Sequence, residues 1–103
     1  MKSLTKPKDC DSIQQIRDAI DVIDQGILEL FAQRHEYVKE IVKFKSRDEE
    51  EIIAKERKEL VLKQRKSWAE EQGLDPEMME KVFRLLIEKN IQIQIDINNS
   101  THK

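Results

Sequence analysis

Two cations, Arg34 and Lys45, stand where a helical pattern calls for apolar side chains. They are eleven residues apart, about three turns of an α-helix, so both point to one face about 16 Å apart along the axis. An unpaired charge in an apolar face costs on the order of several kcal/mol. The pair therefore indicates a small anion held between two long basic side chains. The alternative is that each forms a buried ion pair with Asp or Glu on a facing helix.

Arg17 lies too far from these cations to serve the same ligand. It precedes Arg34 by seventeen residues, which is about 25 Å along the helix and a different face. In a dimer of crossing helices, however, the Arg17 of a second chain could reach the anion. From the residues alone, a solvated position on the helix edge is the favoured interpretation.

Neutral donors and one carboxylate complete the set of polar candidates. Asn90 and Gln94 lie one turn apart and continue the apolar row of Phe83 and Ile87. Glu56 occupies a second predicted helix. Buried amides are more often satisfied by neighbouring side chains than by a ligand, so both readings of this pair stay open.

Covalent and metal chemistry have no candidates in the sequence. Cys10, His35 and His102 have no evident partner that would make a nucleophile and base pair. Metal-ligand spacings and glycine-rich phosphate loops are absent, so we expect neither a metal nor a cofactor. A site built from these parts would bind anions and steer charge rather than move protons or form covalent intermediates.

A long helix must position the two cations. Between Ser12 and Ser46 the apolar residues recur in steps of three and four, namely Ile13, Ile16, Ile20, Ile23, Ile27, Leu30, Val38 and Ile41. Such a helix is about 50 Å long, well beyond the diameter of a compact monomer of 103 residues. A second chain is needed to cover its apolar face, and the sequence therefore predicts an intertwined homodimer.

Two further helices follow a charged connector over 47–51. The second is expected over about 52–72, with an apolar face through Ile53, Leu60 and Trp68. Gly73 supplies a left-handed stop, and Asp75 caps the third helix, expected over about 76–98. The third helix should bury Met79, Val82, Phe83, Leu86, Ile87, Ile91 and Ile97.

Composition sets the fold class and excludes several functions. The chain has 103 residues, is 39% charged and holds only two Gly and two Pro, as expected of one all-α domain over 12–98 between a flexible lead-in over 1–11 and a flexible tail over 99–103. Its charges are interleaved with a net charge of −2, which argues against a nucleic-acid partner. Without a long apolar segment or a cysteine pair, we expect a cytoplasmic protein with no membrane partner.

The order of these residues resembles the all-helical, or type II, chorismate mutase family. The matching residues are Ile16-Arg17-Asp18-Ala19-Ile20-Asp21-x-Ile23-Asp24, Gln33-Arg34, Tyr37-Val38-Lys39, Lys45, Glu56-Arg57, Leu86-Ile87-Glu88 and Gln94. Asp9-Cys10 and the stretch 68–75 are most similar to the branch that contains isochorismate pyruvate lyases.

The resemblance implies an intertwined dimer of three-helix chains and a small dianionic substrate. Arg34 and the partner's Arg17 would hold the two carboxylates, and Lys45 and Gln94 would flank the ether oxygen of the enolpyruvyl group. Glu56 would contact the ring hydroxyl. The remaining pocket positions would be Val38, Ile52, Asn90 and Ile91.

The activity expected first from the resemblance is that of a chorismate mutase, which rearranges chorismate to prephenate. The alternative is an isochorismate pyruvate lyase, which releases salicylate and pyruvate from the same kind of site. Many mutases of the family carry an acid where this chain has Ile52, a departure that should weaken recognition of chorismate more than of isochorismate. A helical dimerisation module, in which Arg34, Lys45 and Gln94 only set the register, is the non-enzyme alternative.

Overall fold

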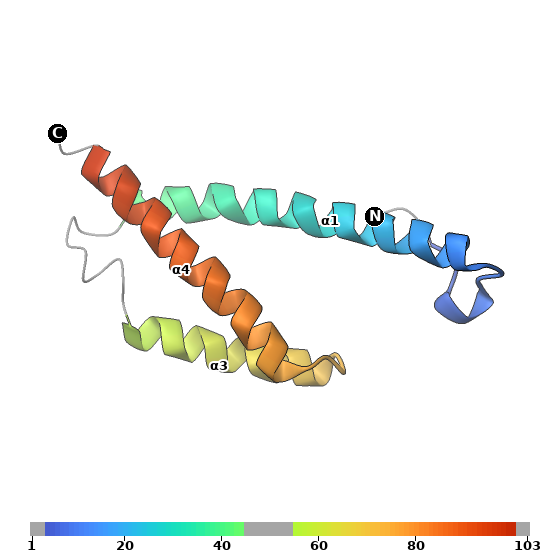
Figure 1. Cartoon of the computed structure of the whole chain (residues 1–103). Helices are drawn as coiled ribbons and strands as arrows, with labels where there is room; N and C mark the ends of the chain where they lie inside the picture. The colour runs from blue at the N-terminus through green and yellow to red at the C-terminus, as the bar shows by residue number, and fades with distance from the viewer. Residues whose placement is uncertain (1–3, 45–54, 101–103) are drawn as a thin grey trace. The chain divides into compact units, whose positions relative to one another are not determined.

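The computed structural model describes residues 4–44 and 55–100, and these residues are almost entirely helical. The three α-helices are α1 (Ile13–Glu40), α3 (Lys55–Glu71) and α4 (Pro76–Ser100), as shown in Figure 1. Two single 3-10 turns, η1 (Pro7–Asp9) and η2 (Ile41–Lys43), precede and follow α1. No strand occurs in the described residues, so the predicted all-α, three-helix class is confirmed.

Local side chains start the long first helix. Ser12 Oγ accepts a hydrogen bond from the Gln15 backbone N–H at 3.1 Å. The Gln15 side chain in turn accepts one from the backbone N–H of Asp11 at 2.6 Å, a reciprocal arrangement related to the capping box. These two bonds cap the first turn, and the helix begins at Ile13.

Helix α1 is long, as the apolar pattern predicts, and a tighter 3-10 turn follows it. It runs to Glu40 and then passes into η2, so the helical path continues to Lys43. The predicted end at Ser46 lies outside the described residues. The chain divides into two compact units, residues 1–36 and 37–103, and α1 extends from the first into the second.

The apolar face of α1 is exposed in the single chain. Ile16, Ile20, Ile23, Ile27 and Leu30 all rank among the exposed large apolar residues. Val38, near the end of the helix, is instead buried. Helix α4 has no comparable exposed apolar row, because its predicted inner residues are at least half-buried.

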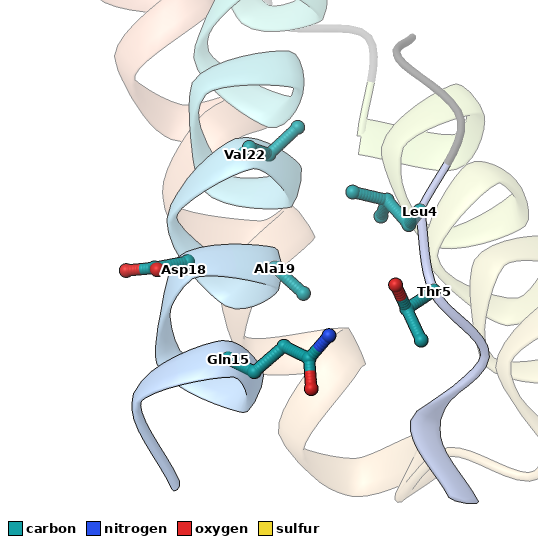
Figure 2. Close-up of a pocket in the computed structure, with 6 residues that line it drawn as sticks. All are labelled: Leu4, Thr5, Gln15, Asp18, Ala19 and Val22. Carbon is teal, nitrogen blue, oxygen red and sulfur yellow. The ribbon is translucent and has the colours of Figure 1, made fainter. Parts of the chain in front are cut away.

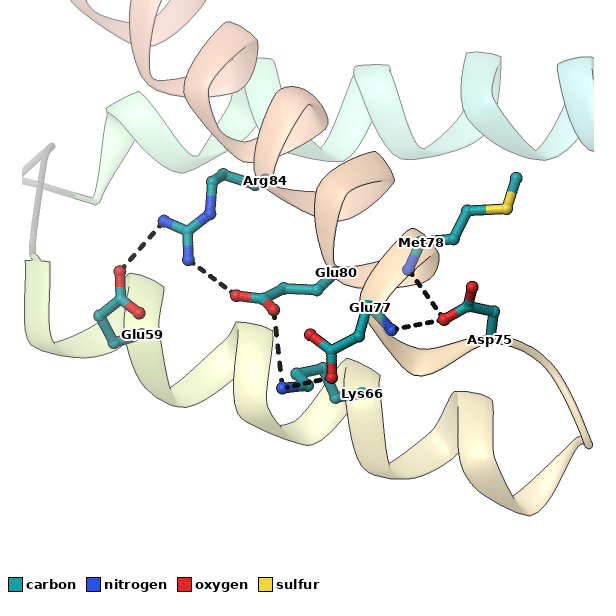
Figure 3. Close-up of polar contacts among 7 residues, drawn as sticks. All are labelled: Glu59, Lys66, Asp75, Glu77, Met78, Glu80 and Arg84. Atoms are coloured by element: carbon teal, nitrogen blue, oxygen red, sulfur yellow. Dashed lines mark hydrogen bonds and ion pairs between the residues drawn. The ribbon is translucent and has the colours of Figure 1, made fainter.

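Helices α3 and α4 form a hairpin whose turn matches the predicted signals. Gly73 has a φ of +72°, and Leu74 N donates to Ala69 O at 2.9 Å while Gly73 N donates to Glu70 O at 3.0 Å. This pair of bonds is a Schellman motif. Asp75 Oδ1 then accepts from the backbone N–H groups of residues 77 and 78, which starts α4 (Figure 3).

The face of α3 that packs on α4 differs from the predicted one. Leu62 is only 1% exposed and Ala69 is also buried, whereas Leu60 and Trp68 are 61% and 48% exposed. The prediction of an inner face through Leu60 and Trp68 was therefore wrong. Aliphatic stems explain the error, because Lys58, Arg65 and Lys66 are half-buried on the packed side and carry their charges outward.

Ion pairs join the two helices of the hairpin along their outer edge (Figure 3). Arg84 contacts Glu80 at 2.9 Å and Glu59 at 3.2 Å, and Lys66 contacts Glu77 at 3.3 Å and Glu80 at 3.6 Å. The hydrogen bond from Arg84 lowers the pKa of Glu80, and the bond to Glu77 raises the pKa of Lys66. These side chains are accessible to solvent, so the ion pairs add little to the stability of the hairpin.

Gly73→Ala should destabilise the chain by about 1–2 kcal/mol, because an L side chain at positive φ is strained. No atom lies within 4 Å of the added Cβ, so the loss would come from the backbone conformation alone. Urea unfolding followed by circular dichroism measures it. Gly73→Asn, which tolerates this conformation better, should lose less, and equal losses for the two variants would contradict the explanation.

Candidate functional site

The predicted residues Val38 and Gln94 meet inside the second unit. Gln94 is 5% exposed and Val38 is 7% exposed. The Gln94 Nε2 group donates a hydrogen bond to the backbone carbonyl of Val38, with an N to O distance of 3.2 Å. The contact forms where α4 packs against the last part of the first helical segment and η2.

The Val38 carbonyl lies close to the point where α1 gives way to a 3-10 turn. In an uninterrupted α-helix each carbonyl accepts from the N–H four residues later. Helix α1 gives way to the 3-10 turn η2 at Ile41, only three residues after Val38, and 3-10 bonds span three residues instead of four. The Gln94 amide therefore donates to a carbonyl that lies next to this change of hydrogen-bond pattern.

This contact determines the orientation of the Gln94 side-chain amide. A carbonyl oxygen can only accept, so the NH₂ group and not the side-chain oxygen must face Val38. An amide NH₂ has two hydrogens, and the bond to Val38 uses one of them. The buried amide therefore keeps a second donor whose position is set by the backbone of α1, which is the property that a site for a developing negative charge requires.

A polar row on α4 contains Gln94. Asn90, Gln94 and Asn98 follow at intervals of four residues and so share one face of the helix. Asn90 is half-buried and Asn98 is buried. Asn98 was not among the predicted site residues, although its interval of four from Gln94 was visible in the sequence. The helix passes the predicted end at 98 and continues to Ser100.

The other described residues of the predicted site are distributed over the three helices. Arg17 is exposed and Arg34 half-buried on α1, and both belong to the first unit. Glu56 is exposed in the first turn of α3, and Ile91 is half-buried on α4. Lys45 and Ile52 lie outside the described residues. The structure therefore unites Val38 and Gln94 and leaves the predicted cation pair untested.

A pocket in the first unit does not coincide with the predicted site. It has a volume of about 200 Å³ and lies between the N-terminal segment and α1 (Figure 2). Leu4 points toward the helix, while the Asp18 carboxylate points away and accepts a bond from Gln14 Nε2 at 2.8 Å. Its other walls are Leu4, Thr5, Gln15, Ala19 and Val22, so no cation is among the described residues that line this pocket.

Two further searches cover the described residues only. None of their His, Cys, Asp and Glu side chains form a group of three or more that could hold a metal ion. Among the same residues, no helix is both long and apolar enough to cross a membrane.

Comparison with known proteins identifies the family. Residues 16–95, which include Arg17, Arg34, Val38 and Gln94, match the family described as Chorismate mutase type II. The chain belongs to the type II chorismate mutase family. The resemblance stated from the motif residues is thereby confirmed, and Gln94 lies one residue inside the end of the matched range.

The known proteins that are similar to this chain have different names. The chain is 42% identical over 89 residues to an isochorismate pyruvate lyase of Pseudomonas aeruginosa, an alignment that covers 86% of the chain and 87% of that protein. It is 30% identical over 84 residues to a chorismate mutase of Methanocaldococcus jannaschii, covering 82% and 85%. A T-protein of Enterobacter agglomerans is 35% identical over 81 residues, which span 79% of the chain but only 22% of that longer protein.

Proposed function

We propose that the chain is an isochorismate pyruvate lyase whose site also rearranges chorismate at a lower rate. The buried Gln94 amide, oriented by the Val38 carbonyl, is the observation that carries the proposal, because it supplies a fixed neutral donor for an ether oxygen. The sequence alone placed the mutase reaction first. The 42% identity over nearly the full length of a lyase, together with Ile52, favours the reverse order.

The substrate would be anchored through its two carboxylates. Arg34 from one chain and Arg17 from the partner chain each offer a guanidinium, which can hold a carboxylate through two parallel hydrogen bonds. Double anchoring would hold the enolpyruvyl side chain over the ring, and such restriction can supply several kcal/mol of the barrier. No cofactor is needed for this step.

Charge stabilisation at the ether oxygen would supply most of the remaining catalysis. In the lyase reaction, the bond between the ring carbon and the ether oxygen breaks while a ring hydrogen moves to the side-chain methylene, which gives pyruvate and salicylate. In the mutase reaction the same bond breaks while a new carbon–carbon bond forms. Lys45 and Gln94 would donate to the oxygen as negative charge grows on it, and one such donor is worth about 10²–10³ in rate.

The ring hydroxyl would decide between the two substrates. Glu56 would accept a hydrogen bond from it, and Val38, Asn90 and Ile91 would line the remaining pocket. Ile52 replaces the acid that many family mutases use for the hydroxyl of chorismate. Isochorismate carries its hydroxyl elsewhere on the ring, so an apolar residue at 52 favours the lyase reaction.

A homodimer is part of the proposal because the site needs a second Arg17. The exposed apolar row of α1, from Ile16 to Leu30, supports it, since burial of such a row stabilises an association by about 25 cal/mol for each Å² removed from water. A helix-only dimerisation module would bury the same row. That alternative predicts no turnover of either substrate.

Paired turnover assays test the assignment. Purified protein is given chorismate or isochorismate in separate reactions, with loss of the enolpyruvyl diene and appearance of salicylate fluorescence as the signals. We expect rapid salicylate release from isochorismate and slow loss of chorismate without salicylate. Faster turnover of chorismate would make the mutase the main activity, and silence with both substrates would contradict the enzyme.

Gln94→Glu should convert a nearly pH-independent activity into one that needs acid. The native amide does not titrate, so we expect wild-type turnover to stay nearly flat between about pH 6 and 8. An introduced carboxyl would be buried and would face the Val38 carbonyl oxygen, and both effects disfavour its charged form and raise its pKa above the usual value of about 4.3. Its single O–H would have to donate to the ether oxygen in place of the Val38 carbonyl. Only the protonated form can donate, so turnover should fall as pH rises through that raised pKa.

Gln92→Glu is the matched control for this pH profile. Gln92 is exposed on the same helix and donates to Asp96 at 2.9 Å, away from Val38. Its variant should keep the flat profile of the wild type. A flat profile in Gln94→Glu, or a steep one in the wild type, would contradict the role given to the amide.

A further inference from the structure

A small apolar pocket lies at the closed end of the α3–α4 hairpin. Trp68, Ala69, Leu74, Met79 and Phe83 form its apolar walls, and its volume is about 170 Å³. Pockets for drug-sized ligands hold roughly 300–1,000 Å³, so this one fits a single ring or a branched alkyl group. All of its walls belong to the second unit and none is among the proposed substrate-binding residues.

Arg65 places one positive charge at this pocket. Its guanidinium carbon lies 4.4 Å from the centroid of the Trp68 ring and 6.0 Å from that of Phe83, an arrangement that holds the group against the apolar wall. Its Nη1 group donates to the side-chain oxygen of Gln64 at 2.6 Å. A guanidinium has five N–H donors, so most of the hydrogen-bonding capacity of Arg65 is left for another acceptor.

Arg65 differs in this respect from the other half-buried cations of α3 and α4. Lys58, Lys66 and Arg84 each pair with at least one glutamate, but no ion pair among the described residues includes Arg65. Burial, and then the nearby charge of Arg57, lower the pKa of Arg65, whereas the glutamates around Arg84 raise its pKa. The positive charge of Arg65 is thus uncompensated where it stands, and an anion beside it would relieve that cost.

We propose that this pocket binds a small apolar monocarboxylate. Its ring or branched alkyl group would occupy the space between Leu74, Met79 and Phe83, and its carboxylate would accept the free N–H groups of Arg65. The ligand class differs from the dianion of the proposed reaction, because this pocket has one cation, Arg65, and one neutral polar residue, Gln72, in an otherwise apolar lining. The proposal therefore stands independently of the proposed function.

Trp68 gives the test a reporter inside the pocket. It is the single tryptophan of the sequence, so its fluorescence and its indole N–H resonance both report on this wall. The protein is titrated with benzoate and with cyclohexanecarboxylate, and separately with benzamide as the neutral analogue of benzoate. We expect saturable changes with both carboxylates and an affinity for benzamide weaker by about tenfold, which corresponds to about 1.4 kcal/mol.

Variants separate the guanidinium from other sources of binding. Arg65→Gln should weaken benzoate by about tenfold, and Arg65→Lys should recover part of the loss. Lys63→Gln, which removes one charge from the exposed side of α3, should leave the affinity unchanged, as should Arg34→Gln in the proposed substrate site. Circular dichroism confirms that each variant is folded.

Three outcomes would overturn the proposal. Equal affinity for benzamide and benzoate would remove the role of charge, and loss of the indole response in Arg34→Gln would mean that Trp68 reports on the substrate site. An indole signal that depends on protein concentration and not on carboxylate would mean that a second copy of the chain covers the pocket.

Discussion

Lys45→Ala should lower turnover of the preferred substrate by about 10²–10³ while the protein keeps its helicity and its oligomeric state. The proposed mechanism gives Lys45 the charged half of the donor pair at the ether oxygen, and the amide of Gln94 supplies the neutral half. Because charge grows on the oxygen only as the bond breaks, the loss should fall on kcat more than on KM. Steady-state kinetics on isochorismate and chorismate measures both constants.

Lys43→Ala is the matched control for this loss. Lys43 lies two residues earlier, is exposed in η2 and pairs with Glu40, so its removal deletes a charge without touching the proposed site. Its turnover should stay within a factor of about two of the wild type, as is usual for surface substitutions. A Lys45→Ala protein that retains turnover but dissociates into monomers would instead support the dimerisation module.

Local signals in the sequence determined the helices of this chain. Ser12, Gly73 and Asp75 each act through atoms within three residues of themselves, as a cap or a left-handed stop. Their effects are therefore readable from a short stretch of sequence. That the first helix is long was predictable for a similar reason, since apolar residues at helical spacing recur over nearly eight turns.

The packed face of α3 was not predictable by the same means. Its inner side is formed partly by the stems of Lys58, Arg65 and Lys66, and a binary reading of apolar and charged residues assigns these positions to solvent. Trp68 was assigned to the apolar face of this helix, yet it is half-exposed and lies against the guanidinium of Arg65. A prediction based on residue type fails for charged residues whose aliphatic stems pack in the interface.

In the candidate site, too, one feature was predictable from the sequence and another was not. That Gln94 would be buried on an apolar row followed from its spacing, but its partner did not, because the acceptor is a backbone carbonyl that every residue possesses. Only the fold shows that Gln94 on α4 lies within hydrogen-bond distance of the Val38 carbonyl near the end of α1. The amide was expected to be satisfied by a neighbouring side chain or a ligand, and the structure gives it a main-chain partner that leaves a second donor.

Arg17→Ala should lower kcat/KM by about 10²-fold, because the substrate loses one of its two carboxylate anchors and with it the reactive orientation. If the arginine comes from the partner chain, two inactive variants should restore each other. Arg17→Ala and Lys45→Ala chains are unfolded together in equal amounts and refolded. Half of the dimers are then mixed, and each mixed dimer has one site with both native residues and one with neither, so about a quarter of wild-type activity should return.

The mixing experiment is more specific than the single substitution, because each variant refolded alone serves as a control for the mixture. Arg17 is exposed on α1 in the single chain, which is where a residue destined for another subunit's site should lie. Arg17→Ala refolded with Arg34→Ala should also regain activity, since these two anchors would likewise come from different chains in each site. Arg34→Ala refolded with Lys45→Ala should stay inactive, because both residues belong to the same chain's site and no native combination can form. No recovery in the first mixture would place Arg17 in the site of its own chain. Recovery in the last mixture would mean that Arg34 and Lys45 come from different chains, and either result would contradict the proposed arrangement.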